Sequence, residues 1–187
     1  MLRKKVPVDC RWPSKQPCLV CDCFERRKFE HEIEMGETLT SATIWLAMLA
    51  WTVAIPFRGR ESVHWLWLAG FVSYLCHMGL AFHYYHDWTQ SAAWEATARD
   101  TEELTGWRSG VGLLVNYAFA VWLAIELVFQ FSNGKPVSLA LEGFIFFMIV
   151  NGAIIFGEGP VRWFGLVLSA RILVAWIQRF RLRSPGS

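Results

Sequence analysis

Long runs of apolar residues, separated by short polar turns, dominate the chain from residue 38 onward. A helix needs about 20 mainly apolar residues to cross the hydrocarbon layer, because that layer is about 30 Å thick and each residue rises about 1.5 Å. The segments that reach this length are residues 38–57, 63–85, 110–131, 137–156 and 161–180. A polar turn at residues 132–136 separates the third from the fourth. The pattern predicts an all-α, polytopic membrane protein with a bundle of four or five transmembrane helices.

The segment 161–180 has two interpretations. It is long enough to span a membrane, but Arg162, Arg171, Gln178 and Arg179 interrupt it. These polar residues do not gather on one face, which favours a spanning helix over an amphipathic helix in the membrane interface. The basic residues favour the opposite, because both chain ends are basic and such flanks stay on the cytoplasmic side. The charge pattern therefore favours four spans and a cytoplasmic N-terminus, with five spans as the alternative.

A further helix is predicted between the second and third spans. Asp87 and Gln90 have the spacing of a capping box, and Gly106 fits a helix stop. The stretch between them is too polar to cross a membrane. We therefore expect residues 88–104 to form an amphipathic helix that lies in the interface.

Composition supports the membrane assignment. The chain is 54% hydrophobic and 18% charged, whereas soluble domains have about 25% charged residues. The net charge of +2 is too small to favour nucleic-acid binding. Motifs of P-loop proteins, serine hydrolases and HExxH metalloproteases are missing from the sequence. We expect contact with the lipid bilayer of a plasma membrane or a bacterial inner membrane.

Residues 1–36 form a polar N-terminal tail that is unlike the rest of the chain. Its cysteines are Cys10, Cys18, Cys21 and Cys23. The second and third of these have C-x-x-C spacing, which directs two thiolates at one metal ion. A site for zinc or another soft metal is one hypothesis, and a tail with reduced thiols is the alternative. Because Met35 stands before the first span, a native chain that begins there is a further alternative.

The histidines near the end of the second span are candidates for a functional site, because ionisable groups inside a membrane are costly. His83 and His86 lie three residues apart on one helix face, and Asp87 follows them. His77 lies about 13 Å deeper, and it joins them if the helix bends at Gly79. The pattern predicts a site for a transition metal at this membrane edge. A haem is less favoured, because no other span contains a histidine. The alternative is that these are interface residues.

Two further groups of polar residues share a depth in the bundle. Asn116 and Asn151 lie at about the depth of the innermost histidine, with Tyr117 beside them. Glu126 and Glu142 lie about 8 Å from the opposite side, where two neighbouring carboxylates would not both ionise. The predicted polar layer and acidic pair would serve the same site. The alternative for the asparagines is hydrogen bonding between helices.

Three functions are compatible with this sequence, and whether the protein is an enzyme stays open. The first is a metal- or proton-handling site at one membrane edge, serving redox chemistry or ion movement. The second is a structural or accessory subunit that docks to a larger membrane complex or to a second copy of itself. The third is a small oligomeric channel with Glu126 or Glu142 in its pore.

Overall fold

The computed structural model describes residues 19–157 and 159–183. Within these residues every regular element is a helix, which confirms the predicted all-α fold class. The α-helices are α1 (Leu19–Ala54), α2 (His64–Tyr85), α3 (Gln90–Thr105), α4 (Val111–Asn133), α5 (Leu139–Ile149) and α6 (Pro160–Arg183). Short 3-10 turns at Ile55–Phe57 and Glu61–Val63 join α1 to α2, and a π-helical stretch, η3 (Val150–Ile155), continues α5.

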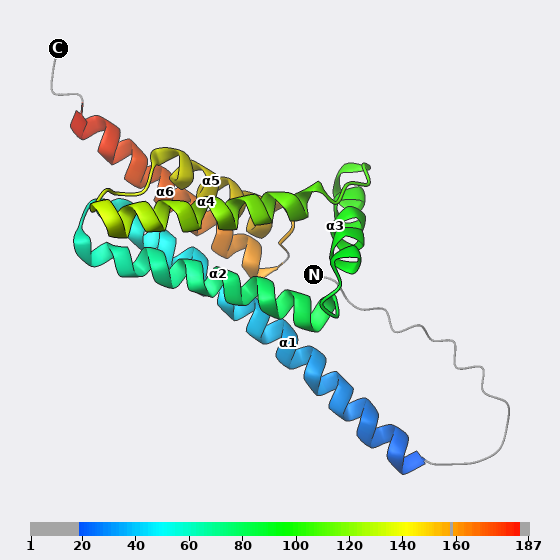
Figure 1. Ribbon diagram of the computed structural model, residues 1–187. Coiled ribbons are helices and arrows are strands. Elements are labelled where there is room, and N and C mark those ends of the chain that lie inside the picture. Colours follow the sequence, from blue (N-terminus) through cyan, green and yellow to red (C-terminus); the bar gives the residue numbers. More distant parts are fainter. Residues whose placement is uncertain (1–18, 158, 184–187) are drawn as a thin grey trace.

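The helices form one elongated bundle, and α3 lies across one of its ends; we call α3 the crosspiece (Figure 1). α1, α2, α4, α5 and α6 run lengthwise, and the first turns of α1 extend beyond the others. α3 lies across the end of the bundle where α2 stops and α4 begins. The turns from α1 to α2 and from α4 to α5 lie at the opposite end. The chain therefore passes along the bundle five times in alternating directions.

Four of the helical segments are long and apolar enough to cross a membrane. They are His31–Phe57, Glu61–Tyr85, Val111–Asn133 and Pro160–Arg181. α5 and η3 together, Leu139–Ile155, form a shorter apolar helix. The segment that the sequence left in doubt is thus a full-length candidate span, while the predicted fourth span is the short one.

The packing of α6 favours the spanning interpretation of the last segment over the interfacial one. Leu168, Ile172 and Ala175 of α6 are buried in the bundle core. The start of α1 and the end of α6 lie at opposite ends of the molecule (Figure 1). This arrangement differs from the charge pattern, which favours both basic ends on one side of the membrane, and the number of spans stays a prediction. The cytoplasmic position of the N-terminus stays a prediction.

The turn between α4 and α5 follows from its residues. Gly134 ends α4 with a φ of 63°, a left-handed conformation that glycine adopts without steric cost. Pro136 has no N–H with which to continue the helix. The Ser138 hydroxyl then accepts a hydrogen bond from Leu141 N at 3.1 Å, and this caps α5. The predicted turn at residues 132–136 is confirmed.

The crosspiece differs from its prediction at one end. Its stop at Gly106 is confirmed, with a φ of 77° at this C-cap. Its N-cap is Thr89, which makes no side-chain cap bond, so the predicted capping box is wrong. Asp87 instead lies in a tight turn with a φ of 46°, and the Gln90 Oε1 accepts a hydrogen bond from Tyr117 at 2.8 Å. Gln90 thus ties α3 to α4 rather than capping α3.

Candidate functional site

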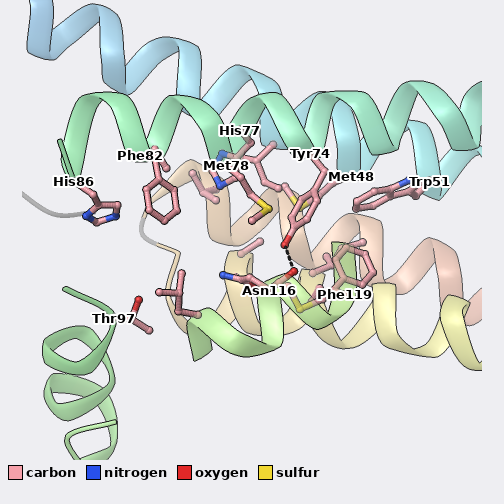
Figure 2. Close-up of a pocket in the computed structure, with 18 residues that line it drawn as sticks. Met48, Trp51, Tyr74, His77, Met78, Phe82, His86, Thr97, Asn116 and Phe119 are labelled. Carbon is pink, nitrogen blue, oxygen red and sulfur yellow. Dashed lines mark hydrogen bonds between the residues drawn. The ribbon is translucent and has the colours of Figure 1, made fainter. Parts of the chain in front are cut away.

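A cavity of about 320 Å³ lies between the helices near the α3 end of the bundle (Figure 2). All the lengthwise helices and α3 contribute to its walls, which are mainly apolar and aromatic. Its polar lining residues are Tyr74, His77, His86, Thr97 and Asn116. An apolar cavity of roughly 300–1,000 Å³ with a few convergent polar groups is typical of a small-molecule site.

His77 lies in the wall of this cavity in a fixed orientation. Its Nδ1 is 2.9 Å from the carbonyl oxygen of Thr40 on α1. Because a carbonyl oxygen only accepts, Nδ1 carries the hydrogen and donates, and Nε2 of the neutral ring is then an acceptor. No other hydrogen bond of His77 is present in the described part of the chain. The imidazole therefore offers an unused acceptor beside the cavity.

Asn116 faces His77 across the cavity from α4. The Tyr74 hydroxyl donates a hydrogen bond to the backbone oxygen of Asn116 at 3.3 Å, which joins α2 to α4. Figure 2 shows the Asn116 side chain reaching into the space between these two helices. Its amide makes no hydrogen bond within the described residues, so a donor and an acceptor are free there.

Aromatic rings close the inner end of the cavity. Trp51 and Phe119 are almost fully buried, with 2% and 0% of their surface exposed. Their ring centroids are 5.5 Å apart in an edge-to-face arrangement, and Tyr74 packs against Phe119 at 5.1 Å. Such contacts fix the rings in place. The cavity is therefore preformed on its aromatic side.

His86 and Thr97 lie at the outer end, near α3 (Figure 2). His86 follows the last residue of α2 and is partly buried. Burial lowers the pKa of His86 below its ordinary value of 6.5, and the negative charges of Asp100 and Asp87 oppose this shift. Burial raises the pKa of the Asp100 carboxyl, with a further contribution from Glu103. Of these titratable groups, His86 lines the cavity itself.

The lowered pKa of His86 predicts a pH-dependent stability. The unfolded chain binds a proton at this residue more readily than the folded chain, so stability is lost as the pH falls through 6.5. The raised pKa of Asp100 acts in the opposite sense, at lower pH. We expect the melting temperature to fall between about pH 7.5 and pH 6, and to fall less in His86→Asn. Circular dichroism of the detergent-purified protein measures this difference.

The exposed His83 provides the matched control for that experiment. His83→Asn should keep the pH dependence of the unsubstituted protein, because His83 is exposed on the outer surface of α2. An equal loss of pH dependence in both variants would show that burial of His86 is not its cause.

The residues of the predicted metal site are not brought together. His77 and His86 line the cavity, whereas His83 is exposed and its Nδ1 accepts a hydrogen bond from Trp88 Nε1 at 3.4 Å. α2 runs unbroken past Gly79, so the bend that would bring His77 to the others is not there. In the described part of the chain, no three His, Cys, Asp or Glu side chains gather as a metal ion needs. The metal site stays a prediction that this geometry does not support.

The predicted polar layer is assembled in part. Asn116 joins His77 in the cavity wall, as their common depth predicted. Asn151 lies in η3, where its carbonyl accepts a hydrogen bond from Phe156 N at 3.0 Å, and it is not among the lining residues. Tyr117 points to α3 through its bond to Gln90. Sequence reasoning missed Tyr74, although its place one turn before His77 puts both rings on one helix face.

The predicted acidic pair lies at the opposite end of the bundle, and each carboxylate there has its own partners. Glu142 is fully buried, with Arg179 Nη1 at 2.9 Å and Arg58 Nε at 3.4 Å. Glu126 accepts hydrogen bonds from Ser138 N at 3.0 Å and from Trp122 Nε1 at 3.2 Å. The sequence argument did not foresee that cations would come to Glu142 from two distant segments. Both carboxylates therefore have partners within the bundle, and the channel hypothesis stays a prediction.

Residues 19–36 of the predicted tail are helical and form the first turns of α1. Cys10 and Cys18, and the side chains of Cys21 and Cys23, lie outside the described residues. The metal hypothesis for these four thiols therefore stays a prediction. The site that the structure presents is therefore the cavity between the helices. Comparison of the chain with protein-family models, curated proteins and solved structures finds no match.

Proposed function

We propose that this integral membrane protein binds a small, mainly apolar molecule with a hydroxyl head in the cavity between α2 and α4. The observation that carries the proposal is the orientation of His77. Its Nδ1 is held by the Thr40 carbonyl, which leaves Nε2 as an acceptor in an otherwise apolar wall. A ligand hydroxyl can donate to this nitrogen.

The other polar groups of the cavity suit the same ligand. The Asn116 amide can donate to the oxygen of the hydroxyl, and the rings of Trp51 and Phe119 accept an apolar or aromatic body. The proposal keeps the site at the membrane edge that the sequence hypothesis chose, with His77 as a hydrogen-bond acceptor in place of a metal ligand.

The binding of two matched probes tests this proposal. 2-Naphthol and naphthalene share one ring system, and only the first has a hydroxyl. We expect 2-naphthol to bind the detergent-purified protein about 2- to 13-fold more tightly, the value of one hydrogen bond. Equilibrium dialysis against protein-free micelles measures both affinities. His77→Phe should reduce the difference between the probes, because it removes the acceptor while keeping the wall apolar and leaving the Asn116 amide in place.

A cavity-filling variant separates the hydroxyl contact from the cavity itself. Ala81 lines the cavity, and Ala81→Phe should weaken the binding of 2-naphthol and of naphthalene to the same extent. His83 is exposed, so His83→Phe should leave both affinities unchanged. Equal binding of the two probes, or a preference for 2-naphthol that is unchanged in His77→Phe, would refute the proposal.

A further inference from the structure

The outward face of α6 has a cation at its centre. Arg171 lies at the middle of the candidate span Pro160–Arg181, which has 22 residues, so it is about 16 Å from either end. Its side chain is exposed on the surface of the bundle. Arg171 makes no hydrogen bond or ion pair with any other described residue.

The surroundings of Arg171 on its own helix are apolar. Val167 and Val174, one turn before and one turn after it, are 66% and 52% exposed. The inward face of α6 is formed instead by Leu168, Ile172 and Ala175, which are buried. Because these core residues fix the rotation of the helix, Arg171 is held away from the bundle.

Membrane proteins accommodate an arginine in two common ways, and neither applies to Arg171. Arginines near helix ends extend to the interface, but Arg171 is about three turns from either end. Arginines in the bundle pair with carboxylates, as Arg179 does with Glu142 at 2.9 Å. A charge at this depth therefore needs a partner that comes from outside the fold.

The chemistry of the missing partner follows from the charge. A guanidinium binds a carboxylate with two parallel hydrogen bonds, and such charge-assisted bonds are roughly twice as strong as those between neutral groups. A second copy of this chain is a poor source, because Glu126 and Glu142 are already engaged. The other carboxylates of the candidate spans lie within the first seven residues of a span and not at its middle; they are Glu32, Glu34, Glu37 and Glu61. The flanking valines suit close packing against another apolar helix.

We propose that the outward face of α6 docks a transmembrane helix of another protein, and that this helix carries an Asp or Glu at mid-membrane depth which pairs with Arg171. This surface is formed by Val167, Ala170, Arg171 and Val174. It lies outside the cavity, and the interaction does not depend on what the cavity binds.

The test uses synthetic transmembrane helices of Leu and Ala with a single central Glu, Gln or Leu. Full-length protein with a donor dye and peptide with an acceptor dye are reconstituted in phosphatidylcholine vesicles, and energy transfer reports association. We expect the Glu peptide to associate about 5- to 30-fold more strongly than the Leu peptide. Arg171→Leu should remove this preference. Arg171→Glu should shift the preference to a peptide with a central Lys.

Arg162→Leu is the matched control, because Arg162 is exposed on the same helix but lies close to its start. It should keep the full preference for the Glu peptide. Equal association of the Glu and Leu peptides overturns the proposal, as does a Glu preference that persists in Arg171→Leu. Energy transfer between two differently labelled copies of the protein alone, if lost in Arg171→Leu, would overturn it in favour of self-association. The charge reversal keeps the test decisive should Arg171→Leu fold poorly.

Discussion

Replacement of Glu142 with alanine is expected to lower the free energy of unfolding by about 3–5 kcal/mol. The Glu142 side chain is fully buried and pairs with Arg179 and Arg58. It also accepts a hydrogen bond from Trp176 Nε1 at 3.0 Å. Its loss leaves two largely buried cations without a counter-charge. This destabilises the fold more than replacing all the charged residues of the cluster with apolar ones would. Unfolding in mixed micelles with increasing sodium dodecyl sulfate, followed by loss of helicity, measures this change.

The ion pair between Glu95 and Arg108 provides the control for that measurement. Both side chains are about half exposed, at 50% and 52%, and water already solvates them. Glu95→Ala should therefore cost less than about 1 kcal/mol. If Glu142→Ala lowers the free energy of unfolding as little as Glu95→Ala does, the cluster of Glu142, Arg58 and Arg179 does not hold α5 and α6 to the α1–α2 turn.

The Glu142 cluster also explains how α6 is fixed in the bundle. Arg179 donates one hydrogen bond to Glu142 on α5 at 2.9 Å and a second to the Ile55 carbonyl at 2.6 Å. One guanidinium therefore joins the last helix to the helix before it and to the end of α1. The end of the last helix is tied in this way to the turn that follows the first helix.

Gly70→Ala is expected to destabilise the protein by about 1–3 kcal/mol. A glycine inside a helix normally lowers stability relative to alanine, so this substitution usually helps. A Cβ at Gly70, however, would overlap the indole nitrogen of Trp51, which is 2% exposed. Because Trp51 packs against Phe119 and Tyr74, the ring cannot move without disturbing the core. The same detergent titration measures the change.

Gly79 on the same helix gives the opposite expectation. Nothing lies within 4 Å of a Cβ built there, so Gly79→Ala should raise the free energy of unfolding by up to about 1 kcal/mol. A gain in both variants would mean that α1 and α2 are not in close contact at Gly70. Trp51 also lines the cavity, so Gly70→Ala should weaken the binding of both naphthalene probes.

What the sequence determined by itself is the set of helices and most of their ends. A helix that crosses the hydrocarbon layer must be long and apolar, and each segment shows these two properties in its own residues. The stops at Gly106 and Gly134 follow in the same way, because only local backbone conformation decides them. The shared depth of His77 and Asn116 was also readable, since it needs only a residue count along antiparallel helices.

What only the tertiary structure decided is the contact of each helix face. Arg179 and Arg58 lie 37 and 84 residues from Glu142 in the sequence, so no local pattern pairs them. The same holds for the buried face of α6, which the polar residues of the segment concealed. His83 left the predicted site because α2 turns it outward, whereas His86 follows the last residue of the helix and reaches the cavity that His77 lines. Charge pairing and cavities depend on how helices rotate against one another, and that rotation is a property of packing rather than of any single segment.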